Sequence, residues 1–158
     1  MRAIPIAIAA CLVLAATPAL ARRHHHAPPP PPRVWRYVEA GRSPRLEYGY
    51  AARPDPRRTS LTCENSGVVR VEQAQPGRPG GGSNLVVGSG GESAAASAEE
   101  HPDPSGGRAI SATFTIDQPV IRGFASSGEL QRASHAQSLT LPRAPADVVH
   151  RFFEHCAP

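Results

Sequence analysis

The sequence predicts an α+β fold that is mainly β, with a small antiparallel sheet or half-barrel closed by a C-terminal helix. Three observations support this prediction. Short segments with the two-residue alternation of strands recur from residue 34 onward. Turns rich in Gly, Pro and Asn separate these segments. The last segment carries apolar residues at the spacing of a helix, which is typical of a helix that packs on a sheet.

The strand signals follow one another along the chain. We expect six or seven short strands among residues 34–38, 46–50, 61–63, 68–72, 84–87, 92–100, 110–116, 130–133 and 138–141. The clearest is 110–116, in which Ile110, Ala112, Phe114 and Ile116 share one face. Residues 92–100 fit a helix or an edge strand, and we favour the edge strand.

Two segments have helix signals. We expect a single helical turn over residues 120–125. Pro119 would start this turn, and Asp117 or Gln118 would cap it. The C-terminal helix begins near Pro145 and places Val148, Phe152 and Cys156 on one apolar stripe, at i, i+4 and i+8.

The apolar phase of each predicted element defines a single core. Its expected members are Trp35, Leu61, Val69, Val71, Val86, Phe114, Ile116, Leu139, Leu141, Val148 and Phe152.

Residues 1–21 have the pattern of a cleaved secretory signal peptide. A positive start precedes an apolar run, and the small residues Ala19 and Ala21 mark a cleavage site. The alternatives are an uncleaved anchor and lipidation at Cys11. Alanine and two prolines weaken a spanning helix. The chain also stays apolar after Cys11, whereas a lipoprotein normally turns polar after its acylated cysteine. We expect an exported, periplasmic protein without a stable membrane span, with 158 − 21 = 137 residues after cleavage.

Residues 22–33 are expected to be a disordered tail rich in His and Pro, and residues 34–158 a single β-rich domain. The five consecutive prolines favour a stiff polyproline II spacer, or a ligand for an aromatic groove. His24, His25 and His26 would be either a metal clamp or part of a solvated tail. We expect the tail, because residues that fix ligand histidines in metal sites are missing around them.

Cys63 and Cys156 are the two cysteines that remain after the signal peptide. In an oxidising compartment, the expected outcome is a disulfide between them. A redox pair is normally close in sequence, as in Cys-x-x-Cys, so we expect a structural bond that holds the closing helix against an early strand.

Composition excludes several classes of function. The chain has no lysine, which excludes Walker A loops and Schiff-base chemistry. From residue 34 onward, 13 arginines balance 13 acidic residues, so we expect no nucleic-acid binding. The seven arginines of residues 33–58 are expected to lay their stems across the aromatic residues nearby.

No catalytic, cofactor or metal site is expected. The chain lacks the Gly-x-Ser-x-Gly elbow of hydrolases, and residues 88–91 complete no dinucleotide loop. Residues 99–103 hold three acids and His101 but are predicted to be an exposed loop. His150 and His155 are five apart, off the spacing for two ligands on one helix face, and are expected to be exposed.

The ordered motifs resemble a group of small exported bacterial proteins of uncharacterised function, over about residues 34–157. The motifs are residues 46–50, 61–63, 119–124, 141–142 and 151–156. The resemblance implies a signal peptide, a β-rich domain, one disulfide and a C-terminal helix, and it brings no activity.

Three functions remain open. The first is a non-catalytic periplasmic domain that binds a protein or envelope component. The second is a small hydrolase inhibitor that presents a loop such as residues 76–82 to its target. The third is an enzyme whose Ser, His and acidic residues come together from distant parts of the chain.

Overall fold

The computed structural model describes residues 29–39, 43–52, 55, 57–65, 67–77, 83–134 and 137–157. The described strands and helices all belong to one compact unit, residues 31–158. They are β1 (Arg33–Val38), β2 (Arg45–Tyr50), β3 (Thr59–Asn65), β4 (Val68–Gln75), β5 (Ser83–Ser89), β6 (Glu92–Asp103), β7 (Gly107–Thr115), α1 (Pro119–Ser127), β8 (Gln131–Ser134), β9 (Gln137–Thr140) and α2 (Ala146–Cys156). The predicted signal peptide lies outside the described residues.

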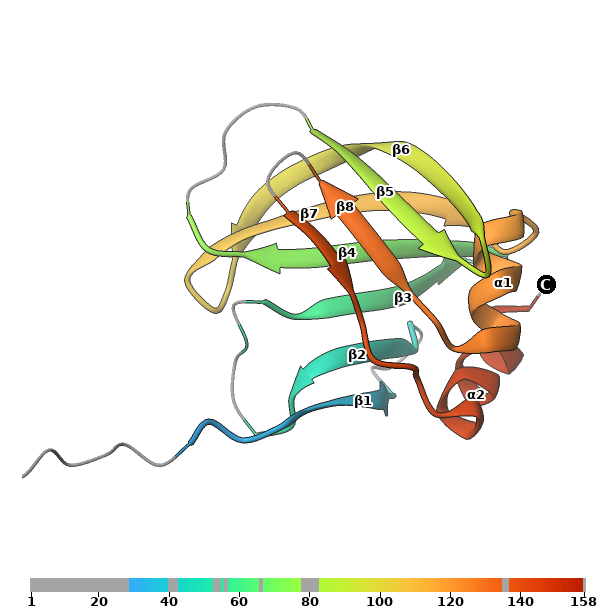
Figure 1. Cartoon of the computed structure of the whole chain (residues 1–158), viewed down its shortest axis with the longest axis horizontal. Helices are drawn as coiled ribbons and strands as arrows, with labels where there is room; N and C mark the ends of the chain where they lie inside the picture. The colour runs from blue at the N-terminus through green and yellow to red at the C-terminus, as the bar shows by residue number, and fades with distance from the viewer. Residues whose placement is uncertain are drawn as a thin grey trace, which may run out of the picture. The chain divides into compact units, whose positions relative to one another are not determined.

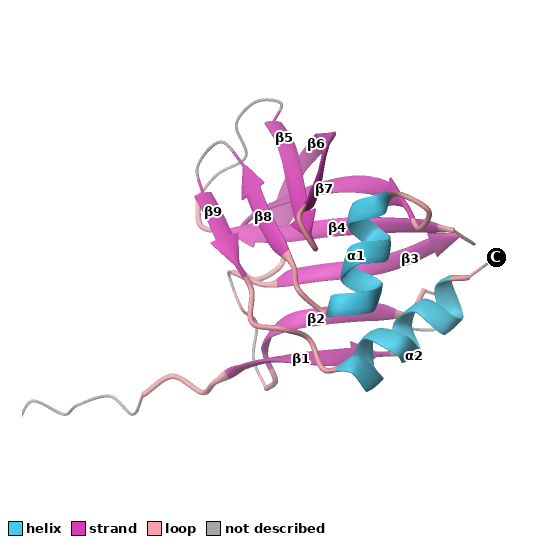
Figure 2. Ribbon diagram, turned by 45° about the vertical axis from the view of Figure 1, so that its right-hand side comes forward, coloured by secondary structure: helices cyan, strands magenta, loops and turns pink. Residues whose placement is uncertain are grey.

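The nine strands described form one antiparallel sheet in the order β1-β2-β3-β4-β7-β6-β5-β8-β9. The sheet curls into a half-barrel, and α1 and α2 lie at one end of it (Figure 1, Figure 2). The predicted fold class is therefore confirmed, including the C-terminal helix.

β6 is the strand that turns the sheet. Its first half, residues 92–98, pairs with β5, whereas its second half, residues 99–103, pairs with β7. The prediction of a strand at 92–100 in place of a helix is confirmed, but β6 is not an edge strand, because it lies between β7 and β5 in the sheet. The predicted loop at 99–103 is also wrong, since Pro102 lies in the strand opposite Arg108.

The half-barrel is closed across its open side by two long-range contacts. The indole nitrogen of Trp35 on β1 donates a hydrogen bond of 2.6 Å to the carbonyl of Pro142, just after β9. The side chain of Gln75 on β4 donates one of 2.9 Å to the hydroxyl of Ser134 on β8. Because β4 and β8 are not neighbours in the sheet, the second bond crosses the interior.

The core is built largely from the predicted strand faces. Trp35, Leu61, Val69, Val71, Phe114, Leu141 and Phe152 are buried, as predicted. Ile116 and Val148 are only partly buried and pack against the rim of the core. The prediction missed Leu46, Leu85, Val87, Ile110, Val120, Ile121, Phe124, Leu130, Ala144 and Val149, which are buried.

Two predicted core residues were wrong. β5 buries Leu85 and Val87, and Val86 between them points to the other face and is half-buried. Leu139 is 41% exposed on the edge strand β9. In β5 the apolar run has no clear alternation, so the pattern does not fix which face meets the core. Leu139 does alternate with Leu141, but β9 is the last strand of the sheet, and the side chain stays exposed there.

Local residues set the start and the end of α1. Gln118, one of the two predicted caps, occupies the N-cap position of α1 but makes no capping hydrogen bond through its side chain, and Pro119 occupies the first turn. Gly128 ends α1 in the left-handed conformation, at φ +69°, where a Cβ atom would lie 2.5 Å from the carbonyl oxygen of Ala144. Only glycine fits this turn.

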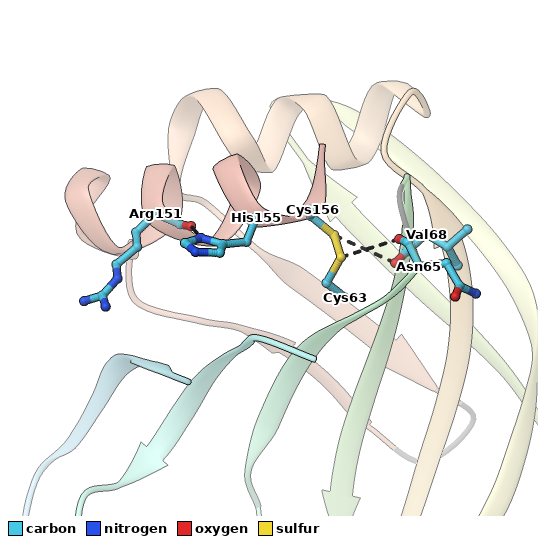
Figure 3. The surroundings of a disulfide bond; sticks show 6 residues. All are labelled: Cys63, Asn65, Val68, Arg151, His155 and Cys156. Atoms are coloured by element: carbon cyan, nitrogen blue, oxygen red, sulfur yellow. Dashed lines mark hydrogen bonds between the residues drawn. A yellow bond between two sulfur atoms is a disulfide. The ribbon is translucent and has the colours of Figure 1, made fainter. Parts of the chain in front are cut away.

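The predicted disulfide joins Cys63 on β3 to Cys156 at the end of α2 (Figure 3). Their Cα atoms are 5.6 Å apart, inside the range that an ordinary disulfide spans. The backbone N–H of Gly67, in the β3–β4 turn, donates a 2.9 Å hydrogen bond to the carbonyl of Cys156. Thus the end of α2 is held at the β3–β4 hairpin by one covalent bond and one hydrogen bond.

Candidate ligand-binding site

The inner face of the half-barrel changes from apolar to polar along each central strand. On β4, Val69 and Val71 lie toward α2 and are followed on the same face by Gln73 and Gln75. On β3, which runs in the opposite direction, Cys63 and Leu61 give way to Thr59. Thr59 and Gln73 are opposite each other in the β3–β4 register. A polar layer therefore lies inside the half-barrel, beyond the apolar core.

One part of this layer is held together by side-chain hydrogen bonds, although Nε of Arg108 has no partner. Gln75 donates to Ser134, and Arg108 on β7 donates to the side-chain oxygen of Gln75 at 3.0 Å. Arg108 also pairs with Glu100 on β6, at 3.2 Å. The chain of bonds links β8, β4, β7 and β6, so it supports the curvature of the sheet.

A second part of the layer has polar groups without a partner. They are the hydroxyl of Thr59, both the nitrogen and the oxygen of the Gln73 amide, and Nε and Nη1 of Arg132. We call Thr59, Gln73 and Arg132 the inner polar cluster. Thr59 and Gln73 are 0% exposed and Arg132 is 2% exposed. A buried donor or acceptor without a partner costs about 1–3 kcal/mol, so such groups are rare in folded proteins.

Strand geometry places these side chains on one region of the interior. Gln73 and Arg132 each lie two residues before the hydrogen-bonded pair Gln75 and Ser134, on the same faces of β4 and β8. β8 follows α1 closely, and β4 starts beside the end of α2, so both strands run away from the helical end (Figure 2). Both residues consequently lie on the helical side of the Gln75–Ser134 bond.

Arg132 is a buried cation without an anion. Burial, reinforced by the positive charge of Arg33, lowers the pKa of Arg132 to about 10. All 13 acidic residues of the chain lie at described positions, and none forms an ion pair with Arg132. Arg33 is itself paired with Asp55, at 2.6 Å. A buried charge without a partner costs several kcal/mol.

The cluster has the chemistry of a binding site. A guanidinium, an amide and a hydroxyl can hold an anion and an adjoining polar group through hydrogen bonds. Neither Thr59 nor Gln73 titrates, and the pKa of Arg132 is too high for a general base at neutral pH. The three side chains therefore recognise a ligand without providing an acid–base pair.

A second feature, the outer arginine pocket, lies on the other face of β1 and β2. It has a volume of about 330 Å³ and is lined by Arg36, Arg45, Glu47, Gly49, Tyr50, Ala51, Ala52, Asp55 and Arg58. Arg36 and Arg45 both pair with the buried Glu47, each at 2.7 Å, and Arg58 pairs with Glu72 and Asp103. Its charges are compensated within the chain, which is the behaviour of a structural ion-pair network.

Of the seven arginines of residues 33–58 that were predicted to pack on aromatic residues, Arg33 does so among the described positions. Arg151, which lies outside that set, also packs on an aromatic ring. The guanidinium of Arg33 lies 4.8 Å from the ring centre of Tyr50, and that of Arg151 lies 4.4 Å from the ring centre of Tyr37. Tyr37 also faces His155, with ring centres 5.8 Å apart.

The other residues considered from sequence do not gather into a site. His150 and His155 are exposed on α2, as predicted. Residues 88–91 are the last two residues of β5 and the two-residue turn that leads to β6. In the strand at 99–103, Glu100 pairs with Arg108, and Asp103 pairs with Arg58. His24, His25, His26 and most of the loop at 76–82 lie outside the described residues.

Sequence reasoning missed the inner polar cluster. A signal existed for Gln73, because strand alternation continues from Val69 and Val71 to Gln73 on the buried face. For Arg132 no local signal existed. Its burial depends on β8 lying across the interior, which only the order of distant strands determines.

In the part of the chain that the structure describes, no three His, Cys, Asp or Glu side chains are grouped as metal ligands would be. Neither described helix is long and apolar enough to cross a membrane. Comparison of the chain with family models, curated proteins and solved structures finds no match.

Proposed function

We propose that this protein is a non-catalytic, exported domain that binds an envelope component by enclosing one of its anionic groups in the half-barrel. The observation that carries the proposal is Arg132, which is 2% exposed and pairs with none of the 13 Asp and Glu side chains, all of which lie at described positions. Burying such a cation costs stability, and an anionic ligand would offset that cost.

Export is supported by the disulfide and by the sequence of residues 1–21. Disulfides persist in oxidising compartments such as the periplasm. The same proposal includes membership of a group of small exported bacterial proteins, which the motifs of residues 34–157 resemble. Sequencing of the mature N-terminus should then begin at Arg22, and retention of Met1 or a lipid on Cys11 would contradict export by this route.

Binding rather than catalysis is favoured by the kind of groups present. The groups of the inner polar cluster donate and accept hydrogen bonds, and none is a nucleophile activated by a neighbouring base. A rigid sheet carrying a few convergent polar groups in an apolar surrounding is the usual design of a ligand site.

The test is a titration with sodium acetate, in which acetate replaces chloride at constant ionic strength and pH 7. Amide resonances of residues 72–75 and 131–134 should shift in the wild type, and the thermal midpoint should rise. Arg132→Met should abolish both responses. Arg122→Met removes an exposed arginine on α1 and should leave them intact. Equal responses in the wild type and Arg132→Met would refute the proposed site.

A further inference from the structure

We propose that the ligand of the inner polar cluster is the C-terminal end of a peptide, a carboxylate joined through one carbon to a secondary amide. The inference rests on the proposed function and goes further, because it names the ligand chemistry. Two features of the cluster carry it, the number of its uncompensated charges and the pair of free groups on Gln73.

The charge count favours a ligand with one negative charge. Three arginines are associated with the polar layer and its surroundings, Arg33, Arg108 and Arg132. Arg33 pairs with Asp55 and Arg108 pairs with Glu100, at 2.6 and 3.2 Å. Only the charge of Arg132 has no counterpart among these groups. A carboxylate would neutralise it, whereas a phosphate with two charges would leave one buried negative charge in excess.

Gln73 specifies the group next to the carboxylate. Its side-chain amide is 0% exposed, and both its nitrogen and its oxygen have no partner. The nitrogen can only donate and the oxygen can only accept. A secondary amide satisfies both at once, because it accepts through its carbonyl and donates through its N–H. An ester, an ether or a hydrocarbon chain would leave at least one end of Gln73 buried without a partner.

The positions of the two residues agree with a compact ligand end. The 2.9 Å bond between Gln75 and Ser134 holds β4 and β8 together, and Gln73 and Arg132 are the preceding inward-facing residues on these strands. Thr59 lies directly opposite Gln73 and has a free hydroxyl. Arg132 would bind the carboxylate, Gln73 the last peptide group, and the hydroxyl of Thr59 would add a hydrogen bond to either.

Four small probes separate the parts of this inference. N-acetylglycine has the carboxylate and the amide, and acetoxyacetate replaces only its N–H by oxygen. Propionate has the carboxylate alone, and N-acetylglycinamide has the amide without the charge. Dissociation constants are measured by titration calorimetry or by NMR on the disulfide-bonded protein at pH 7.

For the wild type we expect N-acetylglycine to bind about tenfold more tightly than acetoxyacetate or propionate, because only its N–H satisfies the oxygen of Gln73. N-acetylglycinamide should bind more weakly than N-acetylglycine by a similar factor or more. Gln73→Leu should remove the preference for the amide while propionate still binds. Gln131→Leu, at an exposed position of β8, should keep the preference and serves as the matched control.

The outcomes distinguish the two proposals. Equal affinity of the wild type for N-acetylglycine and acetoxyacetate would overturn the peptide inference and leave carboxylate binding in place. If no carboxylate probe binds, the proposed function fails as well. Because the comparison between the amide and the ester uses the wild type, it remains decisive even when Gln73→Leu does not fold.

Discussion

Trp35 and Pro142, 107 residues apart in the chain, tie the first strand of the half-barrel to the segment that leaves the last one. The indole N–H of Trp35 donates to the Pro142 carbonyl at 2.6 Å. The ring also packs at 5.4 Å from Tyr48 and 5.9 Å from Phe124, between ring centres. A single side chain thus joins β1, β2, α1 and the approach to α2.

Trp35→Phe should therefore lower the free energy of unfolding by about 1–3 kcal/mol, because it keeps an aromatic ring and leaves the Pro142 carbonyl without its donor. Urea denaturation measures this loss. Val34→Ala, at a neighbouring side chain that is 42% exposed, should change stability by less than about 0.5 kcal/mol. Similar losses in the two variants would mean that the Trp35–Pro142 bond contributes little.

Phe114→Ala tests the core of the half-barrel. Phe114 is 2% exposed on β7, opposite Val69 on β4. Its truncation should cost about 3–5 kcal/mol, from lost burial and from the cavity left behind. Leu139→Ala, at a side chain of the edge strand β9 that is 41% exposed, should cost less than about 1 kcal/mol. A loss below about 1 kcal/mol for Phe114→Ala would show that this strand face is not the core.

Several elements could be predicted from the sequence because their signals are local. β7 alternates cleanly through Ile110, Ala112 and Phe114, and α2 has a helical apolar period. The phase of β5 could not be read, because Leu85, Val86 and Val87 form an unbroken apolar run that suits either face. The same limit applies to the stripe of α2, where Val149 is buried in place of its neighbour Val148.

The candidate site could not be predicted, since it depends on which strands meet across the interior. A pattern of residues indicates that a strand has a buried face. It does not indicate that β8 passes over β4 and places Arg132 inside. The disulfide was predictable only because the chain offers a single pair of cysteines after the predicted signal peptide.

Removal of the disulfide should destabilise the protein and release α2 first. For a sequence separation of 93 residues, the chain-entropy model gives a loss of about 4–5 kcal/mol for Cys63→Ala combined with Cys156→Ala. Hydrogen exchange should rise in residues 146–156 before it rises in β4 and β7. Uniform acceleration in all three elements would show that the disulfide stabilises the whole fold without a special effect on α2.

Asp55 predicts a specific loss of stability in acid. Burial opposes ionisation of its carboxyl, but hydrogen bonds from the Arg33 side chain and the Arg57 backbone outweigh burial, so the pKa of Asp55 is lowered from its ordinary 3.8. A lowered folded pKa contributes stability that is complete above about pH 4 and is lost as the pH falls through the folded value.

Asp55→Asn should accordingly be less stable than the wild type at pH 7, and the difference in free energy of unfolding should shrink as the pH falls below 3.8. Arg33→Gln removes the partner of Asp55, so this variant should also lose less stability than the wild type as the pH falls below 3.8. A difference between wild type and Asp55→Asn that stays constant from pH 7 to pH 2 would contradict the ion pair.

The central claim is that Arg132 is kept in the fold for its ligand, at the expense of stability. Burial lowers the folded pKa of Arg132 from its ordinary value to about 10, so the charged form is disfavoured in the fold, and this cost is present at every pH below about 10. The most direct measurement is the free energy of unfolding of Arg132→Met at pH 7, by urea denaturation without added carboxylate. The account predicts that this variant is more stable than the wild type by about 1–4 kcal/mol, whereas a variant less stable than the wild type would contradict it.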